Sequence, residues 1–130
     1  IRRIPVVRIV LDGEAVCLRP DGHPDFHALR SRQACREARL MAFDLLGLEG
    51  SYLMPLPVYE RRRQLATVLE EAEDRVWFSG HVEGEQGLKL FEQGRALTLE
   101  GIVSKRVESR YRSGPSRDWW KIKNPEYERR

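Results

Sequence analysis

Leu40-Met41-Ala42-Phe43-Asp44-Leu45-Leu46 is a short, mostly apolar run of the kind that a buried strand shows. Upstream of it, residues 9–18 read as an extended segment with β-branched residues on both sides of an Asp-Gly pair. Downstream, after a loop at 47–56, Pro57 sits where a helix would begin. Apolar residues then recur at helical spacing from Val58 to Ala72 through a charged segment. This order of strand, strand and helix predicts an α+β fold.

The rest of the chain continues the same mixture of helices and strands. Pro20-Asp21-Gly22 predicts a turn, because Pro fixes φ and Gly accepts a positive φ. The other predicted elements are strands at Pro5–Leu11, Arg75–Phe78, Gly101–Lys105 and Trp119–Lys123, a short helix from Pro24-Asp25 through Phe26 and Leu29, and a helix over Glu83–Gly94. No repeat or low-complexity stretch interrupts this pattern.

The bulk composition fits one domain, or part of one, in a cell interior. The chain has 130 residues, of which 41% are hydrophobic and 33% charged, which is an ordinary globular balance. Cys17 and Cys35 lack the spacing of zinc ligands, so we interpret them as reduced thiols of a cytosolic protein. No stretch approaches the roughly 18 apolar residues that a membrane span needs, and the chain does not open with a signal-peptide pattern.

Positive charge is concentrated near the C-terminus. Residues 1–100 hold 14 basic and 16 acidic side chains, whereas residues 101–130 hold 9 basic and 4 acidic ones. An anionic partner is therefore expected to meet the C-terminal segment, and a solvated basic tail is the alternative.

The strand Trp119-Trp120-Lys121-Ile122-Lys123 carries two cations on one face. Alternate residues of a strand share a face, so Lys121 and Lys123 project together with Trp119. Two ammonium groups side by side suit contact with a phosphate. The alternative is an edge strand whose lysines lie in solvent and prevent aggregation.

Two acidic segments are candidates for metal or phosphate chemistry. Glu100 precedes a glycine and a strand that ends in the cations Lys105 and Arg106, and a carboxylate there can hold a magnesium ion. Acids beside glycines are also common in turns. The segment Leu11-Asp12-Gly13-Glu14 has the same ambiguity, with a hairpin turn as the alternative.

Taken together, these segments resemble a known family. Four of them resemble, in order, four nucleotidyltransferase motifs of ATP-dependent DNA ligases: Leu11–Glu14, Ala42–Leu46, Glu100–Arg106 and Trp119–Asn124. Asp25–Leu29 and Tyr111–Asp118 look like intervening signatures of the bacterial ligases associated with end joining. The resemblance implies an α+β, antiparallel-sheet nucleotidyltransferase fold, ATP-grasp-like, of a ligase adenylation domain.

The resemblance also implies an activity. Ligases of this family attach AMP from ATP to a lysine, pass it to a DNA 5′-phosphate, and release it when the 3′-hydroxyl of the nick attacks. The implied cofactors are ATP and Mg²⁺ or Mn²⁺. The implied partner is nicked double-stranded DNA, and no association with a membrane is expected. The expected location is the bacterial cytoplasm, on the nucleoid when the protein is bound to DNA.

Residue by residue, the resemblance assigns roles to matching positions. Glu14 corresponds to the glutamate near the ribose and the metal, and Glu100 to the metal-associated acid. Phe43 corresponds to the aromatic that stacks on adenine, with simple core packing as the alternative. Lys121 and Lys123 correspond to the pair that contacts the α-phosphate.

Three further cations are assigned less directly. Lys105 matches a cation of the fourth motif. Arg112 and Arg117 flank the loop before the last strand and can meet nucleotide or DNA backbone phosphates, or lie in solvent.

The sequence departs from the family at the first motif, a lysine two residues before an Asp-Gly. The two Asp-Gly pairs have Val10 and Arg19 at that position, and an arginine that stays protonated cannot act as a nucleophile. Residues 1–130 are therefore expected to form a partial adenylation domain without the nucleophilic-lysine segment and the C-terminal OB-fold. Such a chain would not seal DNA alone, and an open sheet edge near Val6–Leu11 would invite self-association. Two alternatives are a non-catalytic nucleotide- or DNA-binding remnant and a plain interaction domain.

Overall fold

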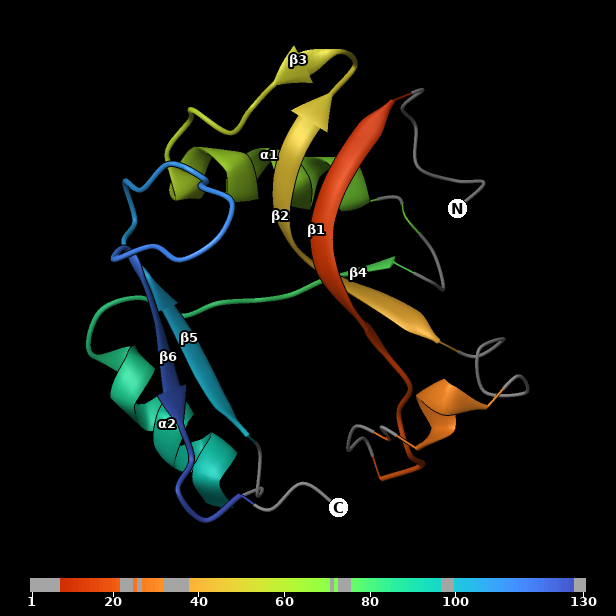
Figure 1. Ribbon diagram of the computed structural model, residues 1–130, viewed down its shortest axis with the longest axis vertical. Helices are drawn as coiled ribbons and strands as arrows, with labels where there is room; N and C mark the ends of the chain where they lie inside the picture. The colour runs from red at the N-terminus through yellow and green to blue at the C-terminus, as the bar shows by residue number, and fades with distance from the viewer. Residues whose placement is uncertain are drawn as a thin grey trace.

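The computed structural model describes residues 8–21, 25, 27–31, 38–70, 72, 76–96 and 100–127. Within these ranges the chain forms a four-stranded sheet, a separate two-stranded sheet, two α-helices and one short 3-10 helix (Figure 1). The predicted α+β class is confirmed. No helix in the described ranges has the length and apolar character that a membrane span requires.

The first sheet is built around β2 (Arg39–Leu48), the strand that the apolar run predicts. β1 (Ile9–Val16) pairs with it antiparallel along one edge, and β3 (Ser51–Tyr52) pairs antiparallel at its end. β4 (Val76–Phe78) pairs with the start of β2 in the parallel direction. The sheet is therefore mixed, and the expectation of a purely antiparallel sheet is wrong at β4. The helix between β2 and β4 is the crossover that parallel strands need.

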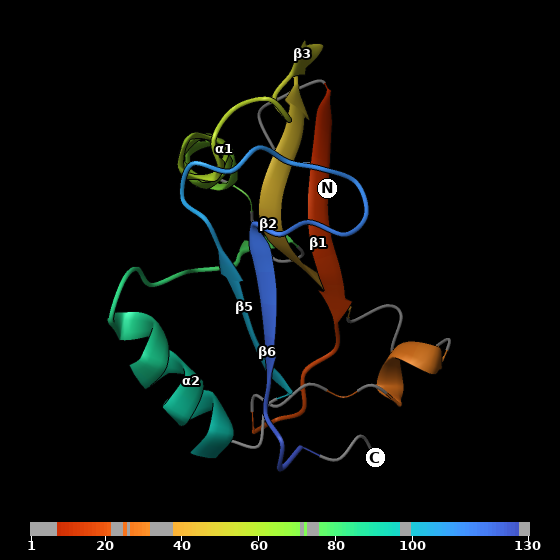
Figure 2. The same ribbon diagram turned by 60° about the vertical axis from the view of Figure 1, so that its left-hand side comes forward.

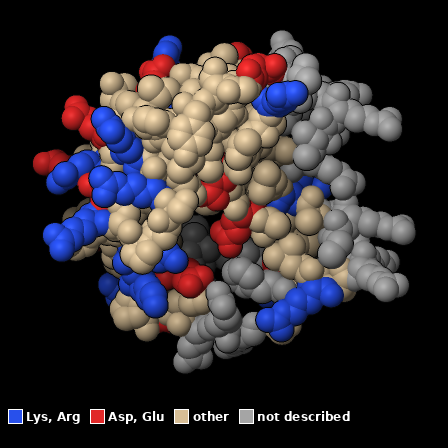
Figure 3. Space-filling view, turned by 45° about the horizontal axis from the view of Figure 1, so that its top comes forward, with Lys and Arg blue, Asp and Glu red and all other residues tan. Residues whose placement is uncertain are grey.

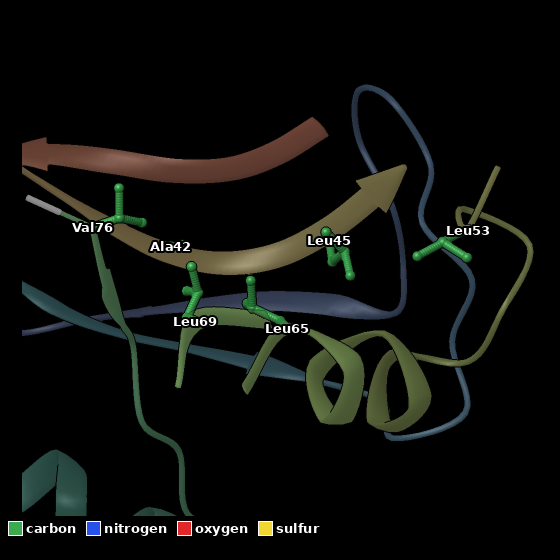
Figure 4. Close-up of a cluster of buried hydrophobic side chains, with 6 residues drawn as sticks. All are labelled: Ala42, Leu45, Leu53, Leu65, Leu69 and Val76. Atoms are coloured by element: carbon green, nitrogen blue, oxygen red, sulfur yellow. The ribbon is translucent and has the colours of Figure 1, made fainter. Parts of the chain in front are cut away.

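That helix, α1 (Val58–Leu69), begins directly after Pro57 and covers one face of the first sheet (Figures 1 and 2). Its predicted apolar stripe is confirmed. The buried core cluster of the described residues joins side chains from β2, α1, β4 and the loop after β3, and Figure 4 shows them: Ala42, Leu45, Leu53, Leu65, Leu69 and Val76.

The register between β1 and β2 shifts at two places. The pairing of Asp12 with Asp44 and of Gly13 with Ala42 leaves Phe43 as an extra residue on β2, and a second shift leaves Leu46. These are β-bulges, which bend a strand and redirect its side chains. Gly13 permits the first one, since a Cβ there would lie 2.6 Å from the backbone oxygen of Met41. Asp12-Gly13 thus lies inside a strand, and the hairpin-turn alternative is wrong.

The second sheet consists of β5 (Gly101–Lys105) and β6 (Trp119–Lys123), with the predicted bounds. The two strands are antiparallel, and Lys105 lies opposite Trp119. The helix α2 (Gln86–Ala96) begins three residues later than expected and lies along this sheet (Figures 1 and 2). At Gly101 a Cβ would lie 2.2 Å from the backbone oxygen of Ile122, so the residue after Glu100 has no room for a side chain.

The segment between β1 and β2 contains the 3-10 helix η1 (Ala28–Arg30). The Asp25 carboxylate accepts a hydrogen bond from the Ala28 N–H at 3.0 Å, consistent with the short helix predicted there. Pro20 and Asp21 lie in a turn, as predicted. Several predicted features lie outside the described residues: the strand residues Pro5, Val6 and Val7, and also Gly22, Pro24, Phe26, Cys35 and Arg75.

Candidate functional site

Three of the described side chains meet where the two sheets come together. The Lys105 Nζ lies 4.6 Å from the centre of the Phe43 ring and 4.1 Å from the centre of the Trp119 ring. Phe43 comes from β2, whereas Lys105 and Trp119 come from β5 and β6, which follow much later in the chain. Phe43 is half-buried and does not belong to the core cluster of the described residues. The bulge therefore presents the Phe43 ring to the second sheet.

Lys105 carries its charge in an environment with little water. Burial lowers the pKa of the Lys105 ammonium, and the negative charge of Asp44 counteracts part of that effect. The faces of the Phe43 and Trp119 rings replace some of the lost hydration, since an ammonium is attracted to the face of an aromatic ring. A ring face, a cation and a second ring are thus assembled at the joint between the sheets.

Lys121 and Lys123 continue from this joint along β6. Both are exposed, and they lie opposite Val103 and Gly101. Opposed residues of an antiparallel pair share a face, so Lys121 and Lys123 project on the same face as Lys105. The structure thus brings three predicted cations onto the face of the second sheet that contacts Phe43.

The predicted acids, Glu14 and Glu100, come from different strands. Glu14 is exposed on β1, two residues after Asp12. Glu100 is exposed directly before β5, and its carbonyl accepts the Asn124 N–H at 2.7 Å. Carboxylate oxygens are ligands that Mg²⁺ prefers, so these two residues fit such an ion chemically. Among the residues that the structure describes, no group of three or more His, Cys, Asp or Glu side chains is placed to hold a metal.

The surface has a hollow in the face that Figure 3 shows, and acidic side chains stand beside it. Basic side chains gather along one side of the same view. In this view the acidic side chains near the centre and the basic ones at the edge occupy separate parts of the surface.

Arg112 and Arg117 lie in the loop between β5 and β6, and both are exposed. The Arg117 carbonyl accepts the Trp120 indole N–H at 2.8 Å, which holds the end of the loop against the start of β6. Arg106 and Arg110 are also exposed in this loop. The loop therefore offers several guanidinium groups to solvent.

A buried ion pair lies beside the Phe43 bulge, between residues that were not predicted as part of the site. Arg61 on α1 is fully buried and binds Asp44 through two hydrogen bonds, Nε to Oδ1 at 2.8 Å and Nη2 to Oδ2 at 3.1 Å. Its Nη1 donates to the carbonyls of Leu56 and, at 3.0 Å, Ser109. Arg61 thus ties β2 to the segment that follows β5.

Arg62 holds the backbone of the Phe43 bulge. Its Nη1 donates to the Phe43 carbonyl at 2.8 Å, its Nη2 to the Ser79 carbonyl, and its Nε to His81 Nδ1 at 3.1 Å. Its guanidinium also lies 4.8 Å from the Phe78 ring centre. Burial lowers the pKa of Arg62, and the negative charge of Asp44 raises it in part.

The burial of Arg61 could have been predicted from its spacing in the sequence. Arg61 follows Val58 by three residues and precedes Leu65 by four, which places it on the buried stripe of α1. An arginine on such a stripe indicates a buried acidic partner, because a lone buried charge is costly.

Tyr111 makes a second link between the sheets. Its hydroxyl donates to Asp12 Oδ2 at 2.7 Å, and its N–H donates to the Met54 carbonyl at 2.9 Å. Its ring meets the Trp119 ring edge-on, with centroids 5.4 Å apart and planes at 77°. The hydrogen bond to Asp12 raises the pKa of Tyr111 to about 12.

The structure thus joins a mixed sheet that presents the Phe43 ring to a second sheet that carries Lys105, Lys121 and Lys123 on one face. Residues 2–123 match the family model described as ATP dependent DNA ligase domain, and the chain belongs to this family. The family predicted from the four ordered motifs is confirmed.

Similar curated proteins and similar solved structures also include DNA ligases. The chain is 40% identical over 119 residues to the multifunctional non-homologous end joining protein LigD of Pseudomonas aeruginosa, covering 87% of this chain and 14% of that protein. It is 31% identical over 133 residues to a probable DNA ligase of Sorangium cellulosum, covering 92% and 24%. The ligase domain of LigD from M. tuberculosis superposes with a TM-score of 0.75 at 35% identity, covering 88% of this chain and 37% of that one. The chain thus spans a small part of these relatives, and the similarity to the end-joining type of ligase is confirmed.

Proposed function

We propose that this chain is part of the adenylation domain of an ATP-dependent DNA ligase that seals nicks through lysyl-AMP and DNA-adenylate. The observation that carries the proposal is the joint between the sheets, where Phe43 meets Lys105 and Trp119 on the face that also bears Lys121 and Lys123. We further infer that the two sheets are walls of an ATP-grasp-like nucleotidyltransferase site. A solved mycobacterial DNA ligase D, described as complexed with ATP and MES, superposes with a TM-score of 0.75 at 34% identity and supports the ligand class.

In this proposal each residue acts through its own chemistry. The Phe43 ring face stacks on adenine, and Glu14 binds near the ribose and the metal. Lys121 and Lys123 offset the negative charge that develops at the α-phosphate, which is the main task of a protein in phosphoryl transfer. Lys105 lies beside the Phe43 ring and binds the nucleotide from the second sheet. Glu14 and Glu100 are the residues that would hold Mg²⁺ or Mn²⁺, and the ion would supply positive charge beside the phosphates.

Comparing ATP with adenosine separates these roles. We expect Phe43→Ala to weaken binding of both ligands, because both contain adenine. The double change Lys121→Ala, Lys123→Ala should weaken ATP by roughly tenfold or more and leave adenosine unchanged, since a hydrogen bond to a charged group contributes about 1.5–3 kcal/mol. Lys89→Ala is the matched control, because Lys89 is an exposed lysine on α2. Calorimetric titration measures all of these affinities.

Two outcomes would contradict the proposed nucleotide site. If wild-type protein binds neither ligand, or if the lysine changes leave ATP affinity as it was, the site is not a nucleotide site and the interaction-domain alternative gains.

The covalent step is tested separately. None of the four lysines of the chain precedes an Asp-Gly pair by two residues. Incubation with labelled ATP and magnesium is therefore expected to leave no AMP on these 130 residues. An adenylated band on a denaturing gel would contradict the proposal that the nucleophile lies outside them.

The proposed macromolecular partner is nicked double-stranded DNA, with Arg112 and Arg117 in contact with its backbone phosphates. Such a protein works where the bacterial nucleoid lies, in the cytoplasm. Among the described residues β1 pairs with β2 alone, so its second edge can accept another copy of the chain.

A further inference from the structure

We propose that Tyr111 is a positioning residue, which sets the place of Lys121 and Lys123 relative to Glu14 and Phe43 by joining β1 to the start of β6. This inference rests on the proposed nucleotide site and deepens it. Tyr111 itself contacts neither the predicted phosphate lysines nor the predicted adenine platform in the contacts described above. Its effect would pass through Asp12 on one side and through Trp119 on the other.

The contacts of Tyr111 reach three separate parts of the chain. Its backbone is fixed to the Met54 carbonyl before α1, its hydroxyl to the Asp12 carboxylate on β1, and its ring to Trp119 on β6. A hydroxyl bound to a carboxylate at 2.7 Å is a charge-assisted hydrogen bond, which is stronger and more directional than a neutral one. The ring is therefore held at both ends, by the backbone bond and by the phenol oxygen.

The two partners of the Tyr111 side chain each lie one strand period from a predicted site residue. Asp12 precedes Glu14 by two residues on β1, and Trp119 precedes Lys121 by two on β6. Residues two apart on a strand share a face, about 7 Å along it. A tilt of the second sheet at Trp119 would thus be carried to Lys121 and further to Lys123, whereas Phe43 would stay with the first sheet.

The contribution of the Tyr111 hydroxyl can be tested without disturbing the packing of the segment between β5 and β6. Arg61 already anchors the same stretch of backbone through the Ser109 carbonyl at 3.0 Å, and the Tyr59 N–H donates to the Val107 carbonyl at 3.2 Å. Removing the phenol oxygen alone leaves these bonds, the Met54 bond and the ring contact in place. What it removes is the direct link from this segment to the strand that carries Glu14.

The test uses Tyr111→Phe and compares ATP with adenosine in the 130-residue chain. We expect ATP affinity to fall by roughly tenfold, the scale of one charge-assisted hydrogen bond. Adenosine affinity should stay within about twofold when measured well below the melting temperature, because adenine and ribose bind through the first sheet. The melting temperature itself should fall, since the hydrogen bond to Asp12 also stabilises the fold. Asp12→Ala should reproduce the loss, while Asp12→Asn, which keeps an acceptor oxygen, should recover part of it. The matched control is Tyr59→Phe, because Tyr59 is 52% exposed on α1 and should change neither affinity.

Each contrary outcome is distinct. An unchanged ratio of ATP to adenosine affinity in Tyr111→Phe, beside an intact wild-type preference for ATP, overturns the positioning role alone. An equal fall for both ligands, measured at a temperature where the variant is fully folded, assigns the hydroxyl to general stability and also overturns it. A wild-type chain without any preference for ATP that depends on Lys121 and Lys123 overturns the proposed function, and the positioning role with it.

Discussion

At the scale of single residues, the Tyr111 phenol and the Asp12 carboxylate form a pair whose strength depends on pH. The hydrogen bond to Asp12 is the largest cause that raises the pKa of Tyr111 to about 12, followed by burial. A phenolate cannot donate this bond, and it would repel the carboxylate. Because the folded-state pKa lies above the ordinary value of 10.0, the stability from this bond is fully present below pH 10. It is lost as the pH rises through about 12.

Spectroscopic titration checks this directly. The chain has four tyrosines, and we expect one of them to ionise later than the others when phenolate absorbance is followed from neutral to strongly alkaline pH. The late component should disappear in Tyr111→Phe and move to lower pH in Asp12→Asn. A titration in which all the tyrosines of the folded chain ionise together near pH 10 would contradict the hydrogen bond.

At the scale of elements, both apolar and ionic contacts hold α1 against the first sheet. Leu65 and Leu69 pack in the core, and Arg61 is buried in the same interface with Asp44 of β2. Arg61→Met should therefore lower the free energy of unfolding by about 3–5 kcal/mol, because it leaves the Asp44 charge buried without a partner. Urea denaturation followed by circular dichroism measures the change.

Two further variants separate charge from volume. Arg61→Met combined with Asp44→Leu should recover part of the loss, since an apolar pair of similar volume can replace a buried ion pair. Arg63→Met should stay near wild type, because Arg63 is exposed and pairs with Glu60 on the surface of the helix. A double variant no more stable than Arg61→Met alone would show that the lost bonds to the Leu56 and Ser109 carbonyls dominate.

Local patterns in the sequence were sufficient to predict most elements. The bounds of β5 and β6 agree with their patterns of glycine, β-branched and aromatic residues, and the apolar spacing of α1 marks its buried face. The parallel pairing of β4 was missed because strand direction depends on where α1 returns the chain, which no three-residue strand encodes. The bulge at Phe43 was missed for a related reason: it is a property of two paired strands.

The candidate site likewise contains features that the local sequence predicts and contacts that it does not. Lys121, Lys123 and Trp119 share a face by strand periodicity alone, and the register of β5 with β6 confirms this arrangement. The contact of Lys105 with Phe43 joins residues of different sheets, and the bond from Tyr111 to Asp12 joins residues 99 positions apart. Such contacts follow from the docking of two sheets, so a one-dimensional pattern carries no sign of them.

At the scale of the whole molecule, two sheets that pack against different helices are joined, within the described part of the chain, by a set of specific side-chain contacts. The first sheet is backed by α1 and the second lies against α2 (Figure 2). Between them stand the ring and ammonium contacts at Lys105, the Tyr111 hydrogen bond and the bonds of Arg61. The proposed nucleotide would bind across this joint, so ligand affinity should report on how firmly the sheets are held together.

The partners of Arg61 also bear on how the chain opens. They lie 17, 5 and 48 residues away, and a guanidinium that loses one buried partner is left with an unsatisfied donor. Opening of the segment at Ser109 should thus be coupled to opening of α1, so that both behave as one cooperative unit. In native-state hydrogen exchange, the Tyr111 amide, which donates to the Met54 carbonyl, and the Tyr59 amide in the first turn of α1, which donates to the Val107 carbonyl, are expected to exchange with the same free energy of opening as the later amides of α1. In Arg61→Met the two groups should separate, with Tyr111 exchanging first, and the joint would then behave as a hinge with its own local equilibrium.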